Sequence, residues 1–275
     1  MEIRNTVHPD DFKHYTTERI KKEFLVQNLF VTNEIKLVYT HFDRMIVGGV
    51  CPNKPIRLEG KKELGTDFFL ERREMGIINV GPKGGVNVDG EKYTLDTKDG
   101  LYVGVGSKEI IFSSDDDNNP AHFYLLSSPA HQKYPTEIVE ISNTEPIPLG
   151  AANESNVRTI YKYIHPEGVK SCQLCMGMTI LEPNSIWNSM PCHTHKRRME
   201  VYFYFNLPDD AVVFHLMGEP HETRHIVIRN EEAVISPDWS IHAGAGTFNY
   251  IFIWGMIGEN QTFTDMDAVN MADLQ

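Results

Sequence analysis

The chain has 275 residues, of which 41% are hydrophobic and 23% are charged, as in an ordinary globular protein. Its formal net charge of −12 argues against nucleic acid or an anionic membrane as partner, because both repel an acidic surface. No apolar run approaches the roughly 20 residues of a membrane span. Residues 1–9 lack the apolar stretch of a signal peptide, so a cytoplasmic protein is expected.

Two short helices are expected near the N-terminus, over residues 10–15 and 17–24, with Asp10 or Thr17 as N-cap. From residue 35 onward, short β-prone runs alternate with turn residues such as Asp89-Gly90 and Asp99-Gly100. Many short strands at near-regular spacing are typical of an all-β sandwich or barrel. The sequence therefore predicts an all-β fold with short N-terminal helices.

A stretch rich in proline and polar residues, 128–150, predicts a linker and hence two domains, 1–150 and 151–275. The two halves align as a degenerate repeat. Residues 68–75 placed under 193–200 superpose two Arg-Arg pairs, and residues 100–106 placed under 240–246 superpose two Gly-x-Gly turns.

The four cysteines predict no metal site of their own. Cys172 and Cys175 form a CxxC pair, but no second pair completes a zinc ribbon. They lie in an expected strand, 171–180, where positions three apart point to opposite faces. Reduced thiols in the core of a cytoplasmic protein are therefore expected.

The strongest chemical signal lies between residues 191 and 205. His193 and His195 alternate along a strand, so their imidazoles share a face, and Glu200 opens a β-prone run that can fold back beside them. His242 precedes a Gly-rich turn downstream. A His-x-His pair alone is more often a surface or core feature, but three imidazoles and a carboxylate together suit a divalent transition metal.

The repeat alignment also predicts which half binds the metal. The positions that align with the four ligands are Phe68, Leu70, Met75 and Tyr102, and none is a plausible metal ligand. The N-terminal domain is therefore predicted to be degenerate and metal-free, and the C-terminal domain to carry the metal.

These motifs resemble those of the cupin superfamily, whose members are double-stranded β-helix (jelly-roll) barrels. The first cupin motif, His-x-His-x(3,4)-Glu, is matched by His193, His195 and Glu200. The second, Pro-x-Gly-x-x-His, is matched by residues 237–242, except that Trp239 replaces the glycine. The resemblance implies a two-cupin architecture.

A narrower resemblance covers nearly the whole chain. The segments that carry it are residues 44–49, 71–80, 163–168, 173–179, 190–195, 197–205, 218–220, 222–227 and 254–256. In these segments the sequence is similar to the 5-dehydro-4-deoxy-D-glucuronate isomerases, or 4-deoxy-L-threo-5-hexosulose-uronate ketol-isomerases, of bacterial pectin breakdown.

This resemblance implies an enzyme, an intramolecular oxidoreductase of pectin and uronate catabolism. Such an enzyme converts 5-dehydro-4-deoxy-D-glucuronate, a small anionic keto-deoxy sugar acid, to 3-deoxy-D-glycero-2,5-hexodiulosonate. The resemblance further implies a homohexamer and one Zn²⁺ per chain, held by His193, His195, Glu200 and His242.

The reaction passes through an enediolate, so it needs a cation at the developing charge and a base. Arg198 and Arg224 are candidates for binding the substrate carboxylate, because a guanidinium suits bidentate contact. Glu222, which shares a strand face with Arg224, is the candidate base. Tyr202 and Tyr204 share a face with Glu200, where they line the pocket or pack in the core.

Two alternatives remain open at this level. An iron cupin dioxygenase would use the same ligands, because fold and ligand set do not determine chemistry. A non-catalytic sugar-acid-binding cupin belongs to a different class. The donor set accepts Zn, Fe, Mn, Co or Ni, so the sequence does not identify the metal. It also does not identify the general base or the substrate range. The oligomeric state follows only from the resemblance.

Overall fold

The computed structural model describes residues 1–275, which fold into two compact units of three segments each. Residue 150 lies between β13 (Pro146–Leu149) and the short 3₁₀ helix η3 (Ala152–Glu154). A single division at that point does not describe the units, because two other segments also change unit. Unit 1 comprises Met1–Arg4, Asn28–Glu145 and Lys162–Met176, and unit 2 comprises Asn5–Gln27, Pro146–Tyr161 and Gly177–Gln275.

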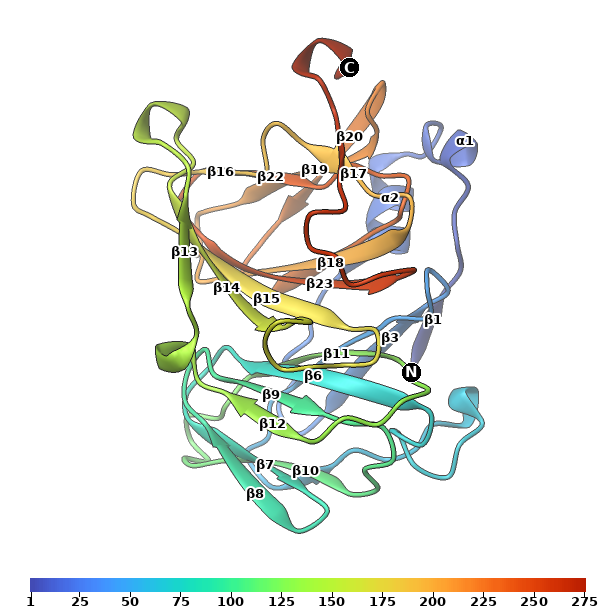
Figure 1. Ribbon diagram of the computed structural model, residues 1–275, viewed down its shortest axis with the longest axis vertical. Helices are drawn as coiled ribbons and strands as arrows, with labels where there is room; N and C mark the ends of the chain where they lie inside the picture. The colour runs from blue at the N-terminus through green and yellow to red at the C-terminus, as the bar shows by residue number, and fades with distance from the viewer. The chain divides into compact units, whose positions relative to one another are not determined.

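Unit 1 contains a seven-stranded and a four-stranded sheet (Figure 1). Its pairings are antiparallel except for the parallel pair β1–β3. In spatial order the larger sheet is β1 (Glu2–Arg4), β3 (Ile35–Thr40), β4 (Ile46–Val50), β11 (Phe123–Pro129), β6 (Arg73–Asn79), β9 (Gly100–Val103) and β12 (Glu137–Val139). The smaller is β5 (Ile56–Arg57), β10 (Ile110–Ser114), β7 (Gly84–Val88) and β8 (Glu91–Leu95).

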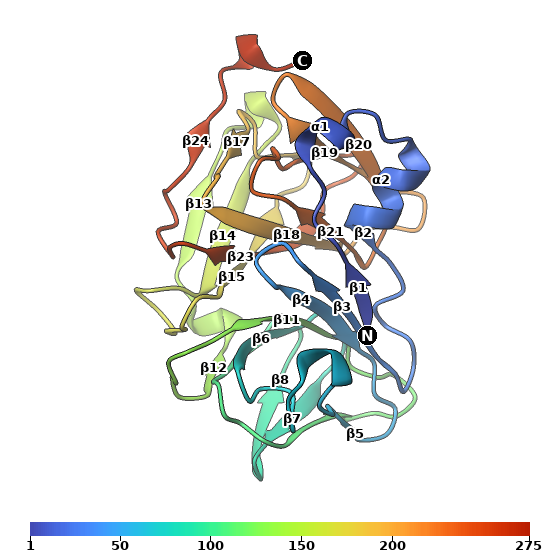
Figure 2. The same ribbon diagram turned by 90° about the vertical axis from the view of Figure 1, so that its right-hand side faces the viewer.

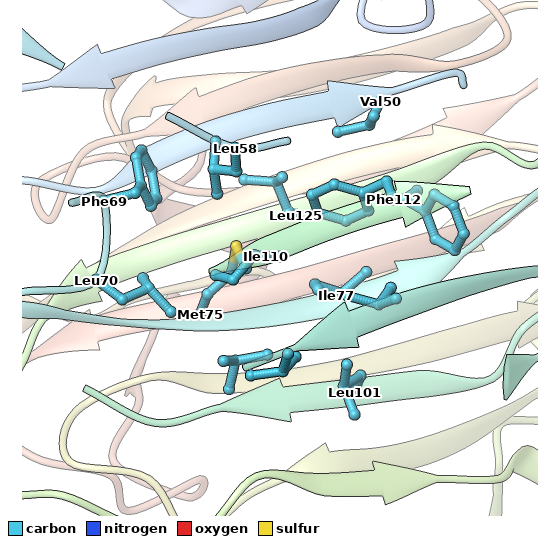
Figure 3. Packing of buried hydrophobic residues seen from close by; sticks show 14 of the residues in the cluster. Val50, Leu58, Phe69, Leu70, Met75, Ile77, Leu101, Ile110, Phe112 and Leu125 are labelled. Atoms are coloured by element: carbon cyan, nitrogen blue, oxygen red, sulfur yellow. The ribbon is translucent and has the colours of Figure 1, made fainter. Parts of the chain in front are cut away.

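An apolar core fills the space between the two sheets of unit 1. Figure 3 shows Met75 and Ile77 of β6, Leu125 of β11, and Ile110 and Phe112 of β10 within this cluster. All five side chains are at most 2% exposed. They alternate along their strands, as expected where one face of a sheet is buried against another sheet.

Of the two Asp-Gly turns expected in unit 1, one has the expected geometry and the other is shifted by one residue. The chain reverses between β7 and β8 at Asp89-Gly90, where both residues have positive φ, of 51° and 94°. This is the turn geometry that the Asp-Gly dipeptide predicts for a hairpin. At Asp99-Gly100 the residue with positive φ is instead Lys98, one position before the dipeptide, and Gly100 already belongs to β9.

Unit 2 repeats the same arrangement of one larger and one smaller sheet (Figure 2). A separate short pair, β17 (His193–Thr194) with β24 (Asp267–Ala268), lies beside them. The larger sheet is β13, β14 (Arg158–Ile164), β15 (Cys175–Leu181), β23 (Ile251–Gly258), β18 (Arg198–Phe205), β21 (Glu232–Ser236) and β2 (Leu25–Val26). The smaller is β16 (Trp187–Asn188), β22 (Ala243–Gly246), β19 (Val213–Glu219) and β20 (Glu222–Ile228).

Both expected N-terminal helices are present, as α1 (Pro9–Phe12) and α2 (Thr17–Phe24). Their N-caps are His8 and Thr16 rather than Asp10 and Thr17. Both caps have extended backbone, and their side chains accept hydrogen bonds from amides of the first turn. The segment joins unit 2 because β2 follows α2 directly and pairs with β21.

Further short helices occur in both units, and none of them is long. They are the 3₁₀ helices η1 (Lys62–Leu64), η2 (Ile141–Asn143) and η4 (Met271–Asp273), in addition to η3. None of the helices has the length and apolarity that crossing a membrane requires.

Trp239, which departs from the cupin motif, has a packing role. Its ring lies 5.2 Å from that of Phe12 and 6.5 Å from that of Phe24, measured between centroids. The tryptophan therefore contacts both N-terminal helices, which explains a large aromatic residue where cupins carry glycine.

All four cysteines are free, and Cys51, Cys175 and Cys192 are buried, so the expected core thiol is confirmed at Cys175. Cys172 is not a core thiol, however, because it precedes β15 in a bend and is partly exposed. Its amide donates to the carboxylate of Glu74 in unit 1, which holds the chain out of the strand at this point.

The internal repeat is visible in the sheet orders, because β6, β9 and β11 occupy the places of β18, β21 and β23. Arg73 and Arg198 begin β6 and β18, and they pair with Pro129 and Gly258, the last residues of β11 and β23, so Met75 and Glu200 are each the third residue of equivalent strands. Met75 pairs with Val103 of β9, and Glu200 with Ser236 of β21. Met75 is therefore the counterpart of Glu200, as the alignment predicted.

The second part of the alignment is wrong. Since Val103 corresponds to Ser236, Tyr102 corresponds to Ile235 and not to His242. The strand that follows His242 is β22, whose counterpart in unit 1 is β10. Gly104 and Gly106 lie where β9 ends in a turn, whereas Gly244 and Gly246 lie within strand β22, so the shared Gly-x-Gly pattern did not mark equivalent positions.

Candidate metal centre

Four side chains from separate elements of unit 2 converge at the predicted metal site. His193 lies on β17, His195 follows it, Glu200 lies on β18, and His242 immediately precedes β22. β18 belongs to the larger sheet and β22 to the smaller one. The site therefore forms only when both sheets of the unit are in place.

The potential ligand atoms all lie within 4.8 Å of one another. Glu200 Oε2 lies 3.1 Å from His195 Nε2 and 3.0 Å from His242 Nε2. His242 Nε2 is 2.9 Å from His193 Nε2. Glu200, His195 and His242 are at most 5% exposed, whereas His193 is partly exposed. The cluster is thus a buried cage with one more accessible member.

Hydrogen bonding around His195 indicates what the cage is built to hold. His195 Nδ1 lies 3.2 Å from the carbonyl oxygen of Arg198, so the Nδ1–H donates to that carbonyl. The lone pair of Nε2 then faces the carboxylate oxygen of Glu200. Two acceptors facing each other at this distance need a cation between them, and three imidazoles with one carboxylate suit a divalent metal.

The ionisation states agree with this reading. Burial and the neighbouring His242 lower the pKa of His193 to about 3, so its imidazole is neutral. Burial by itself would raise the pKa of Glu200, but the imidazoles of His242 and His195 outweigh burial and hold that pKa below its usual value. Neutral imidazoles and an ionised carboxylate are the forms that bind metal.

A cavity of about 260 Å³ opens beside the cage. This is a small volume for a ligand site, suited to a metabolite rather than to a large cofactor. His193, His195 and Glu200 line it together with the aromatic side chains of Tyr202, Phe252 and Trp254. Arg158, at the start of β14, is the one lysine or arginine in the lining.

The two tyrosines of β18 have different surroundings. Tyr202 lines the cavity, whereas Tyr204 does not. The Tyr204 hydroxyl lies 2.7 Å from Nδ1 of His215, a fully buried residue of β19 whose Nε2 has no partner. Burial lowers the pKa of His215 to about 3, so it is neutral. The sequence analysis missed His215, whose only signal was a polar residue at a core position of an apolar strand.

The structure does not bring the other predicted site residues to the cavity. Arg198 is buried, and its Nη1 and Nη2 donate to the carbonyls of Thr262 and Asp265, each at 2.6 Å. Arg224 forms an ion pair of 2.6 Å with Glu222, whose side chain is 41% exposed. None of the three is among the lining residues, so their predicted roles stay predictions.

Comparison with known proteins agrees with this architecture. Residues 24–272 match the KduI/IolB family. The chain is 61% identical to the 4-deoxy-L-threo-5-hexosulose-uronate ketol-isomerase of Caldicellulosiruptor bescii, and 53% identical to that of Escherichia coli. Both alignments cover 100% of each chain.

Solved structures show the fold at low sequence identity. An IolB-like protein from Salmonella typhimurium superposes with a TM-score of 0.67 at 12% identity, covering 82% of this chain and 86% of its own. Oxalate decarboxylase from Bacillus subtilis superposes with a TM-score of 0.57 at 9% identity, covering 79% and 70%. The fold is thus shared with proteins of very low sequence identity. The match of the family model over residues 24–272, together with relatives aligned over their full length, shows that the chain belongs to the KduI/IolB family.

Proposed function

We propose that this protein is a metal-dependent aldose–ketose isomerase that converts 5-dehydro-4-deoxy-D-glucuronate to 3-deoxy-D-glycero-2,5-hexodiulosonate in pectin and uronate catabolism. The observation that carries the proposal is the four-donor cage at the wall of a metabolite-sized cavity. Relatives that bear the ketol-isomerase name and match over the full length support the choice of reaction.

His193, His195, Glu200 and His242 are proposed as the metal ligands, and Zn²⁺ as the ion, one per chain. Three neutral imidazoles and one carboxylate leave a net positive charge on the bound ion. A zinc ion held there would act as a Lewis acid that stabilises negative charge on the oxygens of an enediolate. Zinc is favoured because it commonly takes mixed histidine and carboxylate ligands.

The chain's own residues prepare the cavity for this chemistry. Tyr202, Phe252 and Trp254 exclude water from one wall, which strengthens the electrostatic interactions inside. Burial and the nearby Glu200 raise the pKa of Tyr202 well above its usual value, so its phenol keeps the proton. Tyr202 is therefore not the base, and its protonated phenol at the cavity wall is available as a hydrogen-bond donor.

The carbonyl of Arg198 orients the imidazole of His195 and thereby keeps its Nε2 free of a proton. The buried Arg198 guanidinium holds the carbonyls of Thr262 and Asp265, in the segment that carries the lining residues Phe263 and Met266. In this proposal Arg198 therefore positions the segment that carries Phe263 and Met266, although it does not line the cavity itself.

We also infer that the N-terminal domain is a metal-free structural partner and that the protein works in the cytoplasm as a homohexamer. The apolar residue Met75 at the counterpart of Glu200 supports the first inference. Four free cysteines support a cytoplasmic location, where thiols stay reduced. The hexamer rests on family resemblance, and sedimentation analysis of the purified protein tests it.

Incubation with the products of pectin or alginate lyases tests the activity directly. We expect the 2,5-diketo acid to form, chelation to abolish its formation, and added Zn²⁺ to restore it. Full activity in a metal-free sample would contradict the mechanism. Oxygen uptake with bound iron would support a dioxygenase instead, and binding without turnover would support a sugar-acid-binding cupin.

A further inference from the structure

A uronate carries a carboxylate at the end opposite its aldehyde, so the proposed substrate needs a second anchor besides the metal cage. The arginines expected from the sequence have other partners. The Arg198 Nη atoms donate to two backbone carbonyls, and Arg224 donates to the carbonyls of Thr223 and Lys13 and pairs with Glu222. The following inference rests on the proposed function and concerns the same cavity.

Arg158 has the position that such an anchor requires. It begins β14, and it lines the cavity together with His193, His195 and Glu200. No other lysine or arginine does so. The guanidinium thus shares one small cavity with the metal cage.

The hydrogen-bonding capacity of Arg158 is largely unused. Its Nη1 donates to the carbonyl of Asn156 at 2.8 Å, which orients the planar group. Its Nε is buried and has no partner. A guanidinium has five N–H donors, so an ordered but mostly unpaired one is prepared for an incoming acceptor.

The charge of Arg158 is also uncompensated. No carboxylate forms an ion pair with it, although the chain has 38 acidic residues against 26 lysines and arginines. Burial lowers the pKa of Arg158 below its usual value, and the opposing effects of Tyr202, Tyr250 and Glu154 only partly offset it. Arg158 is half-buried at the wall of the cavity, where a charge is screened less than on an open surface, so an anionic ligand entering the cavity would be attracted to it.

We propose that Arg158 binds the carboxylate of the sugar acid and makes the enzyme select acids over neutral sugars. Nη2 of the guanidinium, which has no hydrogen-bond partner within the protein, suits a charge-assisted contact with a carboxylate. That contact holds the far end of the substrate while the aldehyde and its neighbouring hydroxyl lie at the metal cage. Arg158 is therefore a specificity-determining residue of this site.

Kinetics with the sugar acid and with its methyl ester test this role in Arg158→Met and Arg158→Lys. Replacement by methionine should raise KM for the acid roughly 10- to 100-fold and remove the preference for acid over ester. Lysine keeps the charge but loses the fork, so its KM should lie between those of wild type and Arg158→Met. The metal content of both variants should equal that of wild type.

Arg57→Met is the matched control, because it removes one positive charge from unit 1, where the Arg57 side chain is 52% exposed. Its KM and acid preference should stay those of wild type. An unchanged KM and acid preference in Arg158→Met would overturn the proposal, and so would loss of metal from that variant, which would indicate a structural role.

Calorimetric binding of the acid and the ester separates this proposal from the isomerase assignment. If wild type binds the acid preferentially but does not isomerise it, and Arg158→Met loses the preference, Arg158 retains its role and only the reaction is wrong. If wild type isomerises the acid and Arg158→Met keeps both rate and preference, only the role of Arg158 is wrong.

Discussion

The two units share a scaffold but have different interiors. Strands β6 and β18 occupy equivalent places, and each begins with a buried arginine that donates to backbone carbonyls. Arg73 donates to the carbonyls of Arg44 and Ser127, as Arg198 does to those of Thr262 and Asp265. Two residues further along each strand, unit 1 carries Met75 and unit 2 carries Glu200.

This difference between Met75 and Glu200 accompanies the difference between a packed apolar core and a candidate metal site. In unit 1 the interior between the sheets is filled by apolar side chains, as Figure 3 shows. In unit 2 the corresponding strand presents a carboxylate to three imidazoles, and a cavity of about 260 Å³ remains beside them. The same sheets therefore support either outcome, and the inward-facing side chains decide between them.

Unit 1 also contains a buried carboxylate, but its partners are donors. Glu74 accepts hydrogen bonds from the hydroxyls of Tyr102 and Ser128 and from the amides of Cys172, Gln173 and Leu174. A carboxylate with five donors is satisfied by the protein alone. Glu200 faces imidazole nitrogens instead, one of which presents a lone pair, so its site needs a cation. The partners of each buried acid thus separate the structural role of Glu74 from the ligand role that we propose for Glu200.

Removal of a cage ligand should have the largest effect. His195→Ala should abolish metal binding and lower isomerase activity by more than about 1,000-fold, because the enediolate loses its electrostatic stabilisation. Elemental analysis measures the metal content, and formation of the 2,5-diketo acid measures the isomerase activity. His221→Ala, which removes a 68% exposed imidazole, serves as control and should change neither. A His195→Ala protein that is active without metal would disprove the proposal that unit 2 carries a catalytic metal site and unit 1 does not.

Exchanging the two equivalent residues tests the comparison next. Met75→Glu places an unpaired carboxylate in a side-chain position that is 0% exposed, so the free energy of unfolding should fall by about 3–5 kcal/mol. Met75→Leu, the control, should cost less than about 1.5 kcal/mol. Chemical denaturation measures both. A Met75→Glu protein of wild-type stability would show that unit 1 tolerates a buried carboxylate at this position as well as unit 2 does.

The reverse change, Glu200→Met, should remove the metal while the metal-free protein remains at least as stable as metal-free wild type. Replacement of a buried charge by an apolar side chain is often neutral or stabilising. Elemental analysis and thermal unfolding after chelation check the two parts. A variant that keeps its metal would exclude Glu200 as a required ligand.

Tyr102→Phe should have a smaller effect, confined to unit 1. Glu74 loses one of its five donors, which should lower the free energy of unfolding by about 1–2 kcal/mol. Metal content should be unchanged, because Tyr102 corresponds to Ile235 and not to a ligand. Loss of metal from this variant would contradict a metal-free N-terminal domain.

The pH dependence of stability should show the smallest effect. His215 has a pKa of about 3 when folded, against 6.5 unfolded, because burial disfavours its charged form. As the pH falls below 6.5 only the unfolded state gains this proton, so the free energy of unfolding decreases by up to about 1.4 kcal/mol per pH unit.

His215→Gln, which keeps a polar partner for Tyr204, should therefore lose less stability than wild type between pH 7 and pH 5. Thermal unfolding at the two pH values measures the difference. His221→Gln should behave as wild type, because the His221 side chain is 68% exposed. Equal pH dependence of His215→Gln and wild type would show that His215 takes up its proton in the folded state.

The sequence by itself determined the all-β class, the two short helices and the convergence of the four cage residues. Strand periodicity places His193 and His195 together, and a turn brings Glu200 back to them, so much of the site follows from local geometry. The repeat was detectable for the same reason, since Met75 and Glu200 occupy equivalent registers.

Only the tertiary structure decided which arginine faces the cavity, and which strand of unit 1 corresponds to the one that follows His242. Arg158 stands on β14, far from the cage in sequence, whereas Arg198 lies beside the motif but is turned towards the carbonyls of Thr262 and Asp265. The direction in which a long arginine side chain points depends on which strands and loops pack around it, and these come from distant parts of the sequence. Local pattern shows which residues alternate together, but long-range pairing decides which face becomes the inside.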